Sequence, residues 1–559
     1  MKKICKRLLA VVLTVLMLLP VASQFVQAAT IVDLPIVYVL GKYNPVYNKD
    51  ETQVLYPLDP PIADTVKDNA RSLYAAYQLA HQTNSDAAWE SFANKIYDTV
   101  APRYEAVMMD GNGNPQNGTH TKPNELPKTK KSGFWLHDYQ FAYDSRLDPY
   151  ENARLLNNYI NNVMAVTGKS QVNLIGRCLG STVVATYLTE YGCSKIKTCI
   201  FFAPAFNGVY MMDGFFTSDF KLDYARIKTY LKQGVSDGVD TFGGLRDIID
   251  TADKGGLAGW GISSADDALQ KSAKYLFPRL TLAIFGTWPG HWAMISKEAF
   301  QKAKATTLSD TVKYAGLIKK VERYQNNVMA KFPQTLENCR QQGMHVAIFC
   351  KYNTPMIPLS PDSSMQADGT VQLKTMSLGA TAADINQMLT NTYMQDIKDE
   401  TMSSFVEKQK QSGIKIIPDK NTNTGAIKRS NYLSDDNVID ASTCQYPDYT
   451  WFIRNCPHAS YPQPINQLFL TIFRSPTQYT ITTNKDFPQF IKFTYEKDDD
   501  GNYIYNAEGK KIDKIVPVTN ADRTPEPDPD PVPIPWFERL AKKLTDFFQK
   551  IMLFFGIGR

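Results

Sequence analysis

The sequence has little excess of either charge: 61 Lys and Arg against 56 Asp and Glu leave a formal net charge of +5 over 559 residues. Such a balance does not favour nucleic-acid binding, which draws on strongly basic surfaces. Cysteines and histidines are also few, at eight and six, and no spacing among them resembles a disulfide framework or a metal site. We therefore expect no metal, no cofactor and no nucleic-acid partner.

The apolar run Leu8–Val21 is too short to favour a membrane anchor, although an uncleaved anchor stays open. Basic residues precede this run and small residues follow it, which is typical of a secretory signal peptide over residues 1–29. No cysteine stands at its C-terminal edge, which argues against a lipoprotein. We expect a protein that is secreted or associated with the cell envelope.

One stretch carries specific chemistry. The apolar run Val172–Ile175 breaks at Gly176, and Cys178 stands between Gly176 and Gly180, just before an amphipathic helix. This pattern predicts a nucleophile elbow, a sharp strand-to-helix turn that needs small flanking residues. The alternative is an ordinary turn with a buried thiol. Loss of Cys5 with the signal peptide leaves an odd number of cysteines, so at least one thiol is free; the other alternative is that none is bridged.

Around the elbow, apolar strands alternate with helical periodicities. A helix is expected to begin at Asp148 as its cap, with Pro149 in the first turn and Glu151 as the capping-box acid, and to end at Gly168. Alternating units of this kind predict an α/β fold, a mostly parallel sheet with helices on both faces. The strands before and after that helix are expected in Leu34–Gly41, Gly133–Arg146, Val172–Ile175, Ile196–Ala203, His345–Tyr352 and Tyr449–Arg454.

The chain is expected to divide by composition. We predict a signal peptide (1–29), the first part of the α/β core (30–206), an inserted helical cap or lid (207–340), the second part of the core (341–483), a C-terminal β-hairpin extension (484–523), a proline-rich spacer (524–535) and an amphipathic helix (536–559). The last helix is basic on one face and aromatic on the other. Such a helix is built either to lie on an anionic membrane surface or to dock on the parent domain or a partner.

A cysteine nucleophile requires a base and an acid that orients the base. Among the histidines, His458 alone follows a late strand in a loop, where catalytic groups of parallel sheets collect, so it is the predicted base. The acid is expected between nucleophile and base in the chain. Asp368 is the first choice and Asp440 the second, with Asp435 and Asp436 behind them.

The oxyanion formed during acyl transfer needs hydrogen-bond donors. We expect these donors in the backbone near Lys42, after the first strand, and in the N–H of Leu179, after the nucleophile. The aromatic residues Trp288 and Trp292 of the expected cap are candidates for binding an apolar acyl chain. The alternative for both is plain packing.

These motifs together resemble a known family, the α/β-hydrolases grouped with lecithin:cholesterol acyltransferase and related lipases. The resemblance rests on the elbow Gly176–Gly180, the segment Phe141–Arg146, the Asp-Gly-Thr-Val box Asp368–Val371 and the late His458. It implies an α/β-hydrolase fold with a lid, an ester substrate with a lipid-like acyl group, and a triad of Cys178, His458 and the Asp368 of the box.

Three departures from that family matter. Ser145 stands where the family has tryptophan, Cys178 replaces the elbow serine, and the segment between acid and base is long. Polyhydroxyalkanoate synthases and dienelactone hydrolases resemble this chain in having cysteine at the elbow. Acyl transfer, cleavage of lactones or thioesters, ester hydrolysis, and an inactive elbow in a protein that binds lipid or a partner therefore all stay open.

Overall fold

The structure is a computed structural model. The residues that it describes are 33–41, 44–122, 124–125, 134–221, 223, 226, 257–356, 363–390, 393, 417–418, 427–428 and 432–523. The signal peptide predicted at 1–29, the spacer at 524–535 and the helix at 536–559 lie outside them. Among the described residues, no helix has the length and apolar character that a membrane crossing requires.

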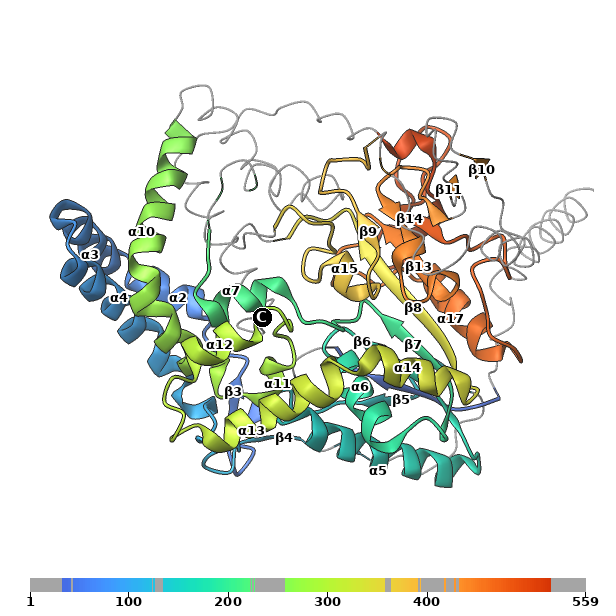
Figure 1. The fold of residues 1–559 in the computed structure, drawn as a ribbon, viewed down its shortest axis with the longest axis horizontal. Coiled ribbons are helices and arrows are strands. Elements are labelled where there is room, and N and C mark those ends of the chain that lie inside the picture. The colour runs from blue at the N-terminus through green and yellow to red at the C-terminus, as the bar shows by residue number, and fades with distance from the viewer. Residues whose placement is uncertain are drawn as a thin grey trace, which may run out of the picture.

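A central sheet of eight strands organises the chain, in the spatial order β15-β14-β13-β8-β7-β6-β1-β5 (Figure 1). Every neighbouring pair is parallel except β14 with β15. The predicted α/β architecture with a mostly parallel sheet is thereby confirmed. The strands are β1 (Ile36–Val39), β5 (Tyr139–Phe141), β6 (Val172–Arg177), β7 (Ile196–Phe202), β8 (His345–Tyr352), β13 (Thr450–Arg454), β14 (Phe490–Tyr495) and β15 (Asp513–Pro517).

Helices cover both faces of this sheet. Phe201 of β7 contacts the ring of Phe332, at the start of α14, whereas the adjacent Phe202 contacts Phe469 of α17. Because successive side chains on a strand point to opposite faces, α14 and α17 lie on opposite sides of the sheet. The helices in chain order are α2 (Ile62–Asp68), α3 (Ala70–Thr83), α4 (Asp86–Val100), α5 (Pro149–Thr167), α6 (Gly180–Tyr191), α7 (Tyr210–Thr217), α10 (Leu257–Thr281), α11 (Pro289–Trp292), α12 (Phe300–Thr307), α13 (Ala315–Tyr324), α14 (Phe332–Gln341), α15 (Leu373–Met376) and α17 (Pro464–Arg474).

Helix α5 shows how the sequence sets local structure. The Asp148 carboxylate accepts the N–H of Tyr150, and Gly168 ends the helix with a φ of +67°, as predicted. Glu151 does not reach back to the cap, because it pairs with Arg154 at 2.6 Å. The cap and stop fix the length of a helix whose buried face packs beside α6.

The segment 207–340, expected as an inserted cap, supplies helices that pack in two different parts of the molecule. Helix α10 lies along α4 at the end of the molecule that projects on the left of Figure 1. The later helix α14 packs against α6, so that part covers the sheet and is not separate from it. The charged hairpin expected at 484–523 is present as β14 and β15, and parallel pairing of β14 with β13 joins it to the main sheet.

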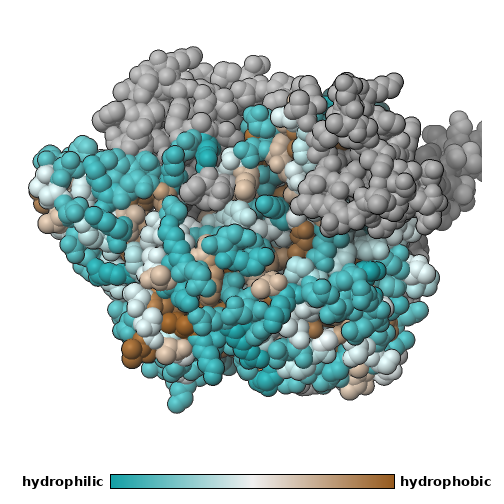
Figure 2. Space-filling view, viewed as in Figure 1, coloured by the Kyte–Doolittle hydropathy of each residue, from teal (hydrophilic) through white to brown (hydrophobic). Residues whose placement is uncertain are grey.

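On the face drawn in Figure 2 the described surface is mainly hydrophilic, with small apolar patches.

Short elements complete the described chain. Three further sheets are small: β3-β2-β4, β12-β9 and β10-β11. Their strands are β2 (Val46–Tyr47), β3 (Val54–Tyr56), β4 (His120–Thr121), β9 (Thr381–Ala382), β10 (Ile417–Pro418), β11 (Ile427–Lys428) and β12 (Ile439–Asp440). The short 3₁₀ and π segments are η1 (Ala101–Val107), η2 (Leu282–Gly286), η3 (Gln325–Met329), η5 (Ala441–Thr443), η6 (Pro447–Tyr449) and η7 (Asn520–Arg523).

Candidate active site

Cys178 occupies the sharp turn between β6 and α6, with a left-handed φ of +47°. The flanking glycines explain how the turn fits. A Cβ on Gly180 would lie 2.6 Å from the carbonyl oxygen of Val39, and one on Gly176 would lie 3.2 Å from the Cα of Ser181. Gly180 is closed to a larger residue, and one at Gly176 would need its neighbours to shift by a few tenths of an ångström. The strained conformation of Cys178 therefore accompanies close packing of strand and helix.

His458 and Asp368 meet across two loops that follow neighbouring strands. The Nδ1 atom of His458 lies 2.6 Å from the Asp368 Oδ2, and the His458 main-chain N–H donates to the Asp368 carbonyl oxygen at 2.7 Å. The second carboxylate oxygen of Asp368 accepts the N–H groups of Thr370 and Val371. Asp368 is therefore buried, fully hydrogen-bonded and aimed at one nitrogen of the ring.

The Cys178 thiol lies beside the His458 ring, and each group shifts the pKa of the other. Burial acts to raise the pKa of the Cys178 thiol, but the charge and hydrogen bond of His458 outweigh it, so the thiol pKa lies below its ordinary value. Burial also acts to lower the pKa of His458, but Asp368 and Cys178 raise it to about 9. At neutral pH, below that value, the His458 ring carries a proton, and its positive charge stabilises the thiolate form of Cys178 relative to the thiol.

The remaining cysteines behave differently. None of the seven described cysteines forms a disulfide, and six of them are buried while Cys178 is half-buried. Burial raises the pKa of Cys339 to about 12 and the pKa values of Cys199, Cys350 and Cys444 as well. Burial thus raises the pKa of these four thiols, whereas the pKa of Cys178 is lowered.

One expected oxyanion donor stands at the site. The Leu179 N–H acts to lower the pKa of the Cys178 thiol, and Leu179 caps the N-terminus of α6, where the helix dipole favours negative charge. Lys42 lies outside the described residues. Its neighbour Gly41 is packed on the elbow, because a Cβ there would lie 2.9 Å from the Cys178 Cβ and 2.3 Å from the Arg177 carbonyl oxygen.

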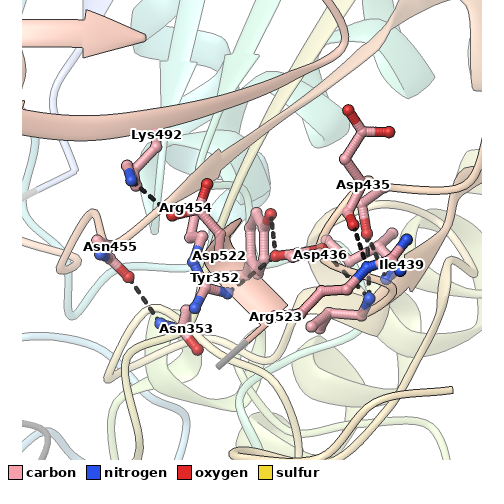
Figure 3. A network of polar contacts seen from close by, with 12 residues as sticks. Tyr352, Asn353, Asp435, Asp436, Ile439, Arg454, Asn455, Lys492, Asp522 and Arg523 are labelled. Atoms are coloured by element: carbon pink, nitrogen blue, oxygen red, sulfur yellow. Dashed lines mark hydrogen bonds and ion pairs between the residues drawn. The ribbon is translucent and has the colours of Figure 1, made fainter. Parts of the chain in front are cut away.

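The second-choice acids have other partners. Asp440 accepts the Ser442 N–H at 2.9 Å, which caps η5, and the Tyr393 hydroxyl at 2.9 Å. The Asp436 carboxylate pairs with Arg454 at 2.8 Å (Figure 3). Geometry therefore brings Asp368, and not these residues, to His458.

Two asparagines tie together the loops that carry acid and base. Asn353 follows β8 with a φ of +66°, and Asn455 follows β13 with a φ of +55°. The Asn353 Nδ2 donates to the Asn455 Oδ1 at 2.6 Å (Figure 3), and the Asn455 N–H donates to the Tyr352 carbonyl oxygen. Asparagine tolerates this left-handed conformation better than most residues, and that preference was the only sequence signal for the pair.

Trp288 and Trp292, the predicted acyl-binding residues, are both buried. Their indole N–H groups donate to the main-chain carbonyls of Val107 and Gly286 at 3.0 and 2.9 Å. Both rings belong to the hydrophobic core. These contacts favour the packing interpretation, and none of them supports substrate binding.

The segment Phe141–Arg146 supplies a buried ion pair. Arg146 is fully buried and its Nη2 lies 2.7 Å from the Asp144 Oδ2. The same guanidinium donates to the carbonyl oxygens of Val107 and Thr119. Its contacts join the start of α5 to the segments around β4, which is a structural role.

No protein-family model matches this chain, and no curated protein is significantly similar to it. Within the part of the chain that the structure describes, no three His, Cys, Asp or Glu side chains are grouped so that they could hold a metal ion.

Proposed function

We propose that the protein is an exported α/β-hydrolase that cleaves or transfers the acyl group of an ester through a covalent thioester on Cys178. The observation that supports this most is the hydrogen bond between His458 and the buried Asp368 carboxylate, beside a Cys178 thiol whose pKa His458 lowers. The lowered pKa of the Cys178 thiol suits this arrangement to nucleophilic attack, because the thiolate is the reactive form of cysteine. Kinship to the lecithin:cholesterol acyltransferase group is part of the same proposal.

In this mechanism the Cys178 thiolate attacks the ester carbonyl carbon, and the new carbon–sulfur bond leaves negative charge on the oxygen. The Leu179 N–H donates to that oxyanion. When the intermediate collapses, the carbon–oxygen bond breaks and His458 gives its proton to the departing alkoxide. His458 then takes a proton from water or from a second alcohol, which attacks the thioester and releases the thiolate.

We propose an apolar or lipid-like acyl ester, with part of the segment 207–340 serving as a lid, and export by the predicted signal peptide. The basic, aromatic helix at 536–559 would hold the enzyme on an anionic membrane surface.

The test is to trap the acyl-enzyme. Purified mature protein is mixed with p-nitrophenyl esters of increasing acyl length and with thioesters, and the mass of the Cys178 peptide is measured beside product release. We expect an acyl adduct on Cys178, loss of adduct and turnover in Cys178→Ala, and retention of both in Cys444→Ala, whose thiol has a raised pKa.

An added alcohol acceptor separates two forms of the reaction. Free acid as the product indicates hydrolysis, and a new ester of the added alcohol indicates acyl transfer. If no substrate gives an adduct and wild type turns over no faster than Cys178→Ala, the proposal fails and a lipid- or partner-binding protein is favoured.

A further inference from the structure

A buried cation lies beneath the candidate base. Lys351 stands near the end of β8, and its side chain is 0% exposed. The Nζ atom lies 4.5 Å from the centre of the Phe202 ring. Burial lowers the pKa of Lys351, while Cys456, Asp368 and Cys178 act in the opposite direction. A lysine in the middle of a packed sheet is costly unless its charge is compensated, so its contacts require an explanation.

All three N–H groups of the Lys351 ammonium can be assigned to one turn. Its Nζ donates to the main-chain carbonyls of Pro457, His458 and Ser460 at 3.2, 3.0 and 2.7 Å. An ammonium has three donors, so the whole capacity of this side chain is used there. Among the described residues Lys351 forms no ion pair with a carboxylate, and these carbonyl dipoles are its main compensation.

A second cation holds the same turn from the nucleophile strand. The Nη2 atom of Arg177, the residue before the nucleophile, donates to the carbonyls of His458 and Ala459 at 3.3 and 3.2 Å. The Arg177 guanidinium also lies over the rings of Phe202 and Tyr461 at 5.7 and 5.6 Å. Strands β8, β7 and β6 are neighbours in the sheet, so the two cations and Phe202 lie side by side on one face.

Every carbonyl from 457 to 460 therefore accepts from a cation of the sheet. On its other side, the His458 N–H is held by the Asp368 carbonyl. The backbone of the base is fixed in both directions, and the ring is left to bridge thiol and carboxylate. Such precise placement matters because small displacements of a catalytic group cost large factors in rate.

We infer that Lys351 and Arg177 are positioning residues that hold the 457–460 turn so that His458 reaches Cys178 and Asp368 together. This inference rests on the proposed function. Neither side chain is assigned contact with substrate, and both act through the main chain of the base loop. Loss of either cation leaves carbonyls unpaired, and the ring moves relative to the thiol.

The test compares Lys351→Met, Arg177→Met and Lys320→Met in the full mature chain. Methionine keeps an unbranched apolar side chain and removes the donors. Lys320 is the matched control, because its Nζ also donates to a main-chain carbonyl, that of Gly113 at 3.1 Å, far along the chain from the site. For each variant, the rate of Cys178 alkylation by iodoacetamide is measured from about pH 5 to 9, together with kcat and KM for an ester that wild type accepts.

We expect Lys351→Met to slow Cys178 alkylation at neutral pH about tenfold or more and to move its pH profile to higher pH, since thiolate fraction falls about tenfold per pKa unit. The value of kcat should fall with KM nearly unchanged. Arg177→Met, which loses two of the five bonds, should have the same effect to a smaller degree, and Lys320→Met should match wild type.

The outcomes separate the inference from the function. If wild-type Cys178 is activated and both folded variants keep its pH profile, the positioning role is overturned while the proposed function stands. If Lys351→Met does not fold, the Arg177→Met variant alone tests the positioning role, because the Arg177 side chain is half-exposed. If Cys178 in wild type labels no faster than the buried thiols, the proposed function fails and the inference fails with it.

Discussion

Replacing His458 by alanine should remove the group that keeps the pKa of Cys178 low. Burial is the largest influence on this thiol and acts to raise its pKa, and only the charge and hydrogen bond of His458, with a smaller part from the Leu179 N–H, bring it down. The nearby Asp368 also acts to raise it. Without His458 the remaining influences mainly point upward, so the pKa should move from below its ordinary value to above it.

This reversal sets the size of the effect. Below the pKa, the thiolate fraction and hence the alkylation rate fall about tenfold for each unit by which the pKa rises. We therefore expect His458→Ala to slow Cys178 alkylation at neutral pH by at least about tenfold. The rate should be followed with iodoacetamide from about pH 5 to 9, with the labelled cysteine identified by peptide mass.

Two controls make the result decisive. The buried thiols Cys199 and Cys350 report general unfolding, because they label only when the core opens. His345→Ala removes a histidine elsewhere in the sheet, whose Nε2 lies 3.4 Å from the Lys197 Nζ, and should leave Cys178 unchanged. An unaltered rate and pH profile in a folded His458→Ala protein would refute the reasoning, because the thiol would then owe its pKa to something other than the imidazole.

Four further outcomes are expected. Asp368→Asn should lower kcat at least about 100-fold by releasing the ring orientation, whereas Asp440→Asn should lower stability toward urea and leave the alkylation rate unchanged; equal effects would contradict the assignment of the acid. The pH profile of kcat/KM should be bell-shaped, rising as the thiol ionises and falling near pH 9, where His458 loses the proton that the leaving alkoxide needs; a profile that stays flat to higher pH would contradict this role. Gly180→Ala should cost about 1–3 kcal/mol in urea unfolding because the added Cβ meets a β1 carbonyl, and an unchanged midpoint would show that the turn can relax. Asn455→Gly should be less destabilising than Asn455→Ala by about 1 kcal/mol, since only alanine pays for the left-handed conformation; the reverse order in the same assay would contradict it.

Local patterns in the sequence were enough for the elements near the nucleophile. The strand, the Gly-x-Cys-x-Gly turn and the following helix are set by residues within one short stretch, and Asp148 and Gly168 bound α5 in the same way. Chain order and position after a strand also led to His458 and Asp368. The choice of Asp368 over Asp440 could not be made with the same security, because both are buried aspartates between nucleophile and base in the chain and only tertiary contacts distinguish them.

The features that could not be predicted from the sequence depend on contacts between residues far apart along the chain. Lys351 reads as a single charge in an apolar strand, and its three acceptors lie 106 to 109 residues away. Trp288 and Trp292 read as a binding surface because aromatic residues line pockets and cores alike, and only their burial separates the two. The sequence predicts the hairpin that contains β14 and β15, but no local pattern indicates that β14 pairs in parallel with β13.

The contact between Arg177 and the His458 loop spans 281 residues of chain. Because of this separation, the pKa of the Cys178 thiol depends on how much of the chain has folded. A chain that is still being synthesised has Cys178 but not yet its imidazole, so the thiol keeps the pKa of an ordinary cysteine, about 8.5. The thiol pKa falls only after the loops that follow β8 and β13 have come together at the elbow. The ionisation of Cys178 therefore depends on long-range assembly of the sheet, and a chain without the His458 loop carries an ordinary thiol.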